Sequence, residues 1–137
     1  MVVPPVALAG VRWLVDGNNL LGTRPDGWWK DRAGAARRLV SRLACRPWGS
    51  DETFIVVFDG PQDDGTLAIG AEAGIQVRFA PGGPDAADDE IARLVSADEV
   101  SDLTVVTSDR VLSQRVRWSG AAVMGAGTFR RMIERDG

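Results

Sequence analysis

The chain has 137 residues, of which 45% are hydrophobic and 26% are charged, and its net charge is −3. These values are ordinary for a globular protein, and the length is sufficient for one domain with a hydrophobic core. The net charge excludes a general attraction to nucleic acid, so any basic surface has to be local. The absence of histidine and the presence of a single cysteine exclude Ser-His-Asp and Cys-His catalysis, an intramolecular disulfide and a histidine-ligated zinc site.

We expect one domain over residues 1–137, because no repeat or long linker divides the chain. Residues 1–10 form an apolar, proline-bearing segment that we interpret as a lead-in to the first strand. This segment has no basic region and is far shorter than a membrane span. A reducing, cytoplasmic location is consistent with the single cysteine.

Short apolar runs alternate with segments of helical periodicity, which is typical of an α/β fold with a mostly parallel sheet. The expected strands, in chain order, are residues 11–16, 53–59, 74–80, 103–107 and 121–124. The expected helices are residues 31–45, 85–97, 110–118 and 128–135. Asp31 is the predicted N-cap of the first helix, residues 60–65 are predicted to form a turn, and the third strand is predicted to lie at a sheet edge.

Aspartates lie at the ends of three expected strands or directly after them: Asp16, Asp59 and Asp109. A fourth, Asp88, lies in the first turn of the expected helix over residues 85–97. The carboxyl ends of parallel strands meet at one sheet edge, where open α/β sheets bind ligands. Carboxylates gathered there repel one another unless a cation neutralises them. The pattern therefore predicts a site for a hard cation, Mg²⁺ or Mn²⁺.

Helix capping is the structural alternative for these aspartates. Aspartate is common at N-caps and in turns, and negative charge is favoured in the first turn of a helix. Capping accounts for each aspartate taken alone, but it does not require all four to converge on one face of the protein. Both explanations remain open from the sequence.

A metal site of this composition is suited to phosphate chemistry. A bound divalent ion lowers the pKa of its water, and two ions can clamp the attacking and leaving oxygens of a phosphodiester. This route needs no histidine. A phosphatase of the haloacid-dehalogenase type needs a second aspartate two residues after the first, whereas Asp16 is followed by Gly17 and Asn18, which argues against that class.

Four segments together resemble the NYN domain family, and in particular its YacP-like branch within the PIN-like nuclease superfamily. They are Val15–Leu21, Val57–Gly60, Ala87–Ile91 and Val106–Arg110. The resemblance extends over about residues 11–133. It implies a three-layer α/β/α Rossmann-like fold with a mostly parallel five-stranded sheet in the order 3-2-1-4-5. It also implies a metal-dependent endoribonuclease with an acidic site at the C-terminal edge of that sheet.

The resemblance also assigns candidate site residues by position. The family's acidic residues, which would be catalytic and hold the metal, correspond to Asp16, Asp59, Asp88 and Asp109. Asn19 matches the asparagine of the first motif, and Asp89 falls where relatives often have a second acid. We expect support for the site from Asn19, Asp89, Thr107 and Ser108.

Four side chains are candidates for contacts with RNA: Arg110, Arg38, Arg42 and Trp28. Arg110 follows Asp109 directly and could stabilise charge on a reacting phosphate. Arg38 and Arg42 are one helical turn apart, either as phosphate contacts or as part of a solvated helix face. Trp28 lies in the loop after the first strand, where both base stacking and packing remain open.

The main hypothesis is a cytoplasmic endoribonuclease that uses Mg²⁺ or Mn²⁺ to hydrolyse RNA phosphodiester bonds. Its partner would be messenger, transfer or ribosome-associated RNA, with no membrane involved, and a homodimer is compatible with the sequence. The alternative is a module with the same fold that binds RNA with weak cleavage or none. RNA binding that tolerates EDTA and gives no turnover would identify the alternative.

Overall fold

A computed structural model of the protein describes residues 11–49, 51–83, 85–97 and 103–135; the predicted lead-in at residues 1–10 lies outside this part. Five parallel strands form one sheet in the order β3-β2-β1-β4-β5, so the predicted order and the edge position of β3 are confirmed. The strands are β1 (Arg12–Asp16), β2 (Thr53–Asp59), β3 (Ile75–Ala80), β4 (Leu103–Val106) and β5 (Ala122–Met124).

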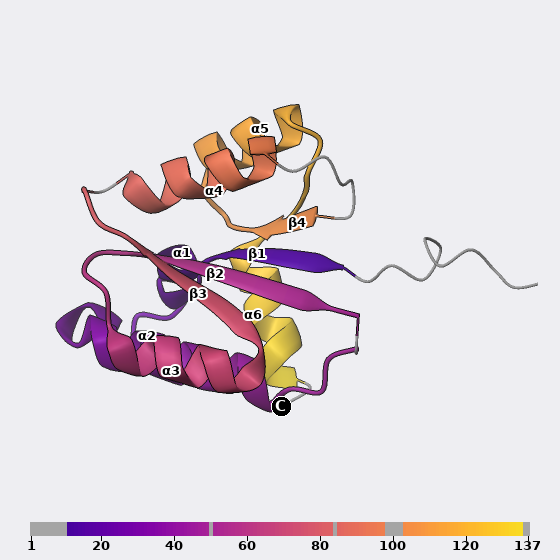
Figure 1. The fold of residues 1–137 in the computed structure, drawn as a ribbon. Helices are drawn as coiled ribbons and strands as arrows, with labels where there is room; N and C mark the ends of the chain where they lie inside the picture. The colour runs from indigo at the N-terminus through magenta and orange to yellow at the C-terminus, as the bar shows by residue number, and fades with distance from the viewer. Residues whose placement is uncertain (1–10, 50, 84, 98–102, 136–137) are drawn as a thin grey trace, which may run out of the picture.

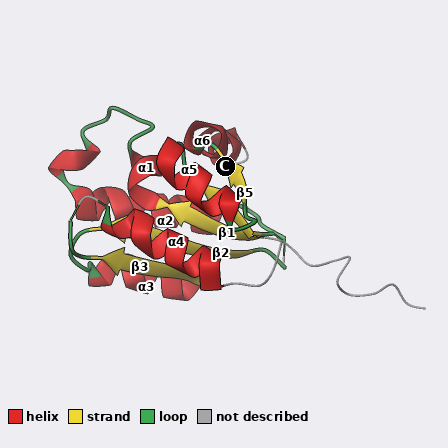
Figure 2. Ribbon diagram, turned by 90° about the horizontal axis from the view of Figure 1, so that it is seen from above, coloured by secondary structure: helices red, strands yellow, loops and turns green. Residues whose placement is uncertain are grey.

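Helices cover both faces of the sheet (Figure 1). They are α1 (Gly17–Leu21), the 3₁₀ helix η2 (Trp28–Lys30), α2 (Arg32–Cys45), α3 (Asp64–Ala73), α4 (Ala86–Ala97), α5 (Arg110–Trp118) and α6 (Ala126–Arg135). Helices α4 and α5 lie together on one face, as Figure 2 shows, and α2, α3 and α6 lie on the other. Asp31 is the N-cap of α2 as predicted, since its side chain accepts a hydrogen bond from the backbone N–H of Gly34.

Side chains of the central strands point alternately to the two faces of the sheet and form an apolar core on each face. Trp13 and Val15 of β1 belong to the core beneath α1, α2 and α6, whereas Leu14 belongs to the core beneath α4 and α5. Successive side chains of a strand point to opposite faces, and a parallel sheet covered on both faces needs apolar residues on each. The apolar runs of β1, β2 and β4 therefore specify a buried sheet with its carboxyl ends along one edge.

Helix α3 was not predicted from the sequence, because the segment before β3 was interpreted only as a turn over residues 60–65. The helix begins after Asp63, whose side chain accepts a hydrogen bond from the backbone N–H of Thr66 at 2.9 Å. Its two glycines are weak helix formers, so local propensity predicts no helix here. At Gly70 a Cβ atom would lie 2.7 Å from the carbonyl oxygen of Ile75, so close packing against β3 requires glycine.

Three further elements differ from the prediction. The loop after β1 contains α1 and η2, and α6 begins at Ala126 rather than at residue 128. None of the helices in the described ranges is long and apolar enough to span a membrane.

Candidate active site

The parallel register brings the ends of the three central strands to one edge. Asp16 ends β1 and pairs in register with Val57 of β2, two residues before Asp59. Val15 pairs with Val106, the last residue of β4, so Asp16 and Thr107 directly follow this pair. The Thr107 hydroxyl donates a hydrogen bond of 2.9 Å to Oδ2 of Asp16. Asp16 and Thr107, separated by 91 positions in the sequence, are thus direct neighbours.

Asp16 is the most deeply buried carboxylate of this edge, with 4% of its surface exposed. Burial raises the pKa of Asp16 to about 7, and the charges of Asp88 and Asp59 add to this increase. The hydrogen bond from Thr107 acts in the opposite direction because it favours the ionised carboxylate. Asp16 therefore titrates near neutral pH in the metal-free protein.

Asp88 lies half-buried in the first turn of α4 and belongs to the same group of charges. Burial raises the pKa of Asp88 to about 6, followed by the charges of Asp109, Asp59 and Asp85, while Arg115 lowers it. Asp16 is raised by Asp88 and Asp59, so each of the four predicted aspartates is coupled to at least one other. Within the described residues the Asp88 carboxylate makes no hydrogen bond, so it caps no backbone N–H, although its negative charge is favoured in the first turn of α4.

In Asp59 and Asp109, one carboxylate oxygen binds a backbone N–H at the start of a helix. Oδ1 of Asp59 accepts a hydrogen bond of 2.9 Å from the backbone N–H of Ala87, which joins the end of β2 to the start of α4. Oδ1 of Asp109 accepts one of 2.9 Å from Leu112 and caps α5. A carboxylate has two oxygens, and Oδ2 of both residues makes no hydrogen bond within the described part of the chain. One oxygen of each therefore remains available to a ligand.

Two asparagines of α1 hold the strand ends in place. The side-chain oxygen of Asn19 accepts a hydrogen bond of 2.7 Å from the backbone N–H of Ser108 after β4. Oδ1 of Asn18 accepts one of 2.8 Å from the backbone N–H of Asp59. Asn18 was not among the predicted site residues, although its place in the first motif beside Asn19 was a usable signal. Helix α1 thus links β1 to both neighbouring strand ends.

Close packing of α1 against β2 depends on Gly17. A Cβ atom at this position would lie 2.5 Å from the Phe58 ring and 2.9 Å from the carbonyl oxygen of Val57. Ser108 adds a further link, because its Oγ accepts a hydrogen bond of 2.9 Å from the backbone N–H of Ala126 at the start of α6. The backbone around the four aspartates is therefore tied to α1, α4, α5 and α6.

The remaining predicted residues fall in different places. Asp89 is exposed and pairs with Arg115 of α5 at 3.0 Å. Arg110 is the exposed first residue of α5 and makes no hydrogen bond or ion pair within the described ranges. Arg38, Arg42 and Trp28 line a separate groove on the α2–α6 side of the protein. The predicted RNA contacts therefore divide between two surfaces.

The fold and the acidic strand edge define a Rossmann-like domain of the type found in PIN-like nucleases. The chain belongs to the YacP-like NYN domain family, whose model matches residues 13–136. This is a nuclease family whose members are typically metal-dependent and act on RNA.

Two solved structures, both of Rae1 (YacP) from Bacillus subtilis, are similar to the chain. A tryptophan-to-leucine mutant of Rae1 matches with a TM-score of 0.69 and 25% identity, covering 90% of this chain and 74% of that one. A second Rae1 structure matches with a TM-score of 0.67 and 23% identity, covering 92% and 75%, and this likeness supports the fold alone. Among curated proteins, no sequence matches the chain.

The donor chemistry of the acidic edge fits the metal that the family implies. Within the described ranges, no three Asp, Glu or Cys side chains are placed so that together they could hold one ion. Mg²⁺ does not need such a group, because it keeps several waters and binds proteins through one or two carboxylates. Burial is the main cause of the raised pKa values of Asp16 and Asp88, and neighbouring carboxylates add to it, so a bound cation would favour the ionised form of both groups.

Proposed function

We propose that the protein is a cytoplasmic, divalent-metal-dependent endoribonuclease that hydrolyses RNA phosphodiester bonds at the acidic edge of the sheet. The observation that carries this proposal is the gathering of the aspartates at one strand edge, where Asp16 ends β1 beside Thr107 and Asp59 at the end of β2 binds the start of α4. Burial and the neighbouring carboxylates raise the pKa of Asp16 to about 7 and that of Asp88 to about 6. Perturbed carboxylates that gather at a strand edge are typical of functional sites. Membership of a nuclease family supplies the reaction class.

In this proposal Asp16, Asp59, Asp88 and Asp109 hold Mg²⁺ or Mn²⁺, directly or through water. The bound ion would activate a water and stabilise the charge of the phosphoryl group. Thr107 orients the Asp16 carboxylate through its hydrogen bond of 2.9 Å. Asn19 and Ser108 keep the end of β4 beside α1, which maintains the spacing between the carboxylates.

Arg110 is the proposed phosphate contact at this edge. It follows Asp109 directly, is exposed, and is not engaged by another side chain of the described residues. A guanidinium beside the metal-binding carboxylates can pair with a non-bridging phosphate oxygen in a bidentate manner. Asp89 plays a positioning part instead, because its ion pair with Arg115 joins α4 to α5.

The test is cleavage of a single-stranded RNA by purified protein in Mn²⁺ and in EDTA. The Asp16→Asn variant should lose cleavage in Mn²⁺, because an amide binds a cation more weakly than a carboxylate does. Asp64→Asn is the matched control, since Asp64 is exposed at the start of α3 and should leave cleavage unchanged. Cleavage that persists in EDTA or in the Asp16→Asn variant would contradict the proposed mechanism.

An RNA-binding module without cleavage is the second candidate function. The observation in its favour is that no three carboxylates of the described residues are arranged around one cation position. This candidate predicts RNA binding that is equally strong in EDTA and in Mn²⁺, with intact RNA after long incubation. Turnover in Mn²⁺ that Asp16→Asn abolishes would rule it out.

A further inference from the structure

A groove of about 580 Å³ lies away from the acidic edge, among α1, η2, α2 and α6. Four arginines contribute to its lining, namely Arg24, Arg38, Arg42 and Arg130, together with the carboxylates Asp26 and Glu134. Four cations against two anions give the groove a charge of +2, whereas the whole chain carries −3. A local excess of this kind concentrates anionic ligands at one surface of an acidic protein.

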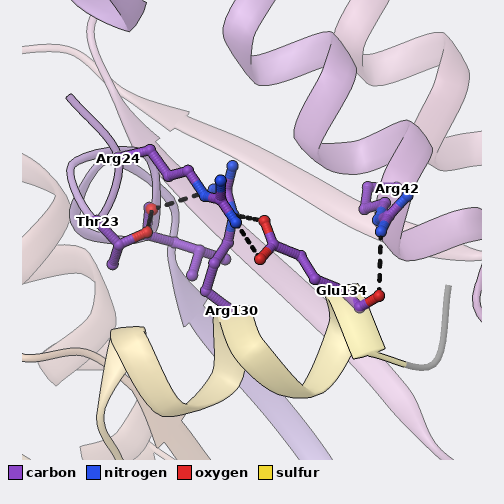
Figure 3. Close-up of polar contacts among 6 residues, drawn as sticks. Thr23, Arg24, Arg42, Arg130 and Glu134 are labelled. Atoms are coloured by element: carbon purple, nitrogen blue, oxygen red, sulfur yellow. Dashed lines mark hydrogen bonds and ion pairs between the residues drawn. The ribbon is translucent and has the colours of Figure 1, made fainter. Parts of the chain in front are cut away.

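Guanidiniums from three elements converge on Glu134 near the end of α6 (Figure 3). Nε of Arg130 donates to Oε2 of Glu134 at 3.0 Å, and Arg24 pairs with Oε1. Nη2 of Arg42 donates to the backbone carbonyl of Glu134 at 3.4 Å. Burial alone would raise the pKa of Glu134, but hydrogen bonds from Arg130 and Arg24 outweigh it and hold that pKa below its ordinary value. The groove thus already binds one internal carboxylate, a group that arginine forks bind much as they bind phosphate.

Part of the positive charge remains available. Arg38 is exposed and makes no hydrogen bond or ion pair within the described residues, and the contact of Arg42 with the carbonyl is long. The two lie one turn apart on α2, which places their Cβ atoms about 5–6 Å from each other. They are therefore close enough for both guanidiniums to act on the same stretch of a polyanion.

Trp28 adds an aromatic wall to the groove. Its indole is half-buried and packs against the core, while the Arg32 guanidinium lies 5.4 Å from the ring centroid. Trp28 also meets Trp29 edge-on, with ring centroids 6.2 Å apart. Trp28 is also part of the groove lining, and base stacking beside a basic groove is typical of proteins that bind single strands.

Helix α1 borders both the groove and the acidic edge. Leu21 of this helix lines the groove and also a smaller pocket of about 160 Å³, whose walls include Asn18 and Asp59. Helix α1 has five residues between Asp16 and the loop, so its length is about 7.5 Å. One short helix therefore contributes residues to both surfaces.

We propose that this groove holds the phosphates of an RNA strand, at a surface separate from the acidic edge. Arg38 and Arg42 contact the phosphates, and Trp28 stacks on a base. Glu134 competes with the RNA because it holds Arg24 and Arg130. The inference rests on the proposed RNA substrate, but it does not depend on cleavage.

Binding of a fluorescent single-stranded RNA of about 12 nucleotides tests the proposal. Anisotropy is measured in EDTA, so that no turnover occurs, over a range of salt concentrations. The variant Arg38→Gln/Arg42→Gln should bind more weakly than wild type. Each lost phosphate contact should reduce the slope of log K against log salt by about 0.7, and two lost contacts should reduce it by about 1.4. The ratio of the wild-type binding constant to that of the variant should therefore fall about sevenfold between 50 and 200 mM salt.

The matched control is Arg117→Gln/Arg131→Gln, which removes the same charge from exposed positions outside the groove. It should bind RNA nearly as well as wild type, and circular dichroism should show both double variants folded. Equal losses of RNA affinity in the two double variants would show that only the net charge of the protein matters, and would overturn the proposal. Unchanged binding in Arg38→Gln/Arg42→Gln would overturn it as well.

Glu134→Gln gives a test with the opposite sign. It removes the competing carboxylate and releases Arg24 and Arg130, so RNA affinity and the salt slope should both increase. Unchanged or weaker binding contradicts the proposal. Cleavage of RNA by wild type in Mn²⁺ is measured separately. If cleavage occurs but binding does not depend on the groove arginines, the ribonuclease proposal stands and the groove proposal fails. If binding depends on the groove arginines but no cleavage occurs, the groove proposal stands and the ribonuclease proposal fails.

Discussion

The Asp16→Asn substitution should stabilise the metal-free protein, although it should abolish cleavage. Asp16 has 4% of its surface exposed, and its pKa rises from 3.8 to about 7 on folding. The folded protein therefore binds this proton more tightly than the unfolded chain does. Stability from this group is complete below pH 3.8 and is lost as the pH rises toward 7.

The magnitude follows from the difference between the two pKa values. A shift of roughly three pKa units corresponds to roughly 4 kcal/mol of unfolding free energy above pH 7, at 1.36 kcal/mol per unit. An asparagine resembles the protonated carboxyl in shape, keeps an oxygen for the Thr107 hydroxyl and cannot ionise. The variant should therefore exceed wild type by a few kcal/mol near pH 8 and by less than about 1 kcal/mol near pH 4.

Urea unfolding followed by circular dichroism in EDTA measures this difference at each pH. Asp26→Asn is the control, because Asp26 is exposed, and its stability should follow wild type at every pH. Mn²⁺ at pH 7.5 should stabilise wild type more than Asp16→Asn, since the ion binds the ionised carboxylate. A difference between Asp16→Asn and wild type that does not change with pH would refute burial of the Asp16 charge.

Thr107→Val keeps the side-chain volume but removes the hydrogen bond that favours ionised Asp16. The acid limb of the pH–rate profile in Mn²⁺ should therefore move to higher pH. An acid limb at the wild-type pH would show that Thr107 has no influence on this carboxylate. Gly70→Ala should lower the unfolding free energy by about 1–3 kcal/mol, because the new methyl group would lie 2.7 Å from the Ile75 carbonyl oxygen. Gly127→Ala in α6 is its control and should be neutral or stabilising by up to about 1 kcal/mol, since its nearest neighbour would lie at 3.6 Å; equal effects of the two substitutions would contradict the steric explanation.

The sheet could be predicted from the sequence because burial on both faces leaves a local signal. The apolar runs that end in Asp16 and Asp59 need no knowledge of distant residues, and neither does the helical periodicity of α2. Helix α3 left no such signal. Its glycines weaken helix propensity, and Gly70 is required only because β3 folds back against it at a Cβ distance of 2.7 Å.

The candidate site divides in the same way. The position of each aspartate at a strand end or helix start is a property of the local sequence. The hydrogen-bond partner of each carboxylate oxygen is not a property of the local sequence. The hydrogen bond from Ala87 to Asp59 joins residues 28 positions apart, and the one from Thr107 to Asp16 joins residues 91 positions apart. The pKa of Asp16 and the hydrogen bond that Asn18 accepts depend on which groups pack beside these side chains, and the local sequence does not specify that packing.

By itself the sequence determined the parallel sheet, its acidic strand ends and the placement of Arg38 and Arg42 one turn apart on α2, because hydrophobic periodicity and residue spacing are visible within a few consecutive residues. Only the tertiary structure decided what surrounds them. It brought Glu134 to Arg24 across 110 positions and placed Arg38 and Arg42 of α2 in the same groove as Arg130 of α6. The physical reason is that contacts between distant segments follow from the packing of helices on a sheet, which no local pattern specifies.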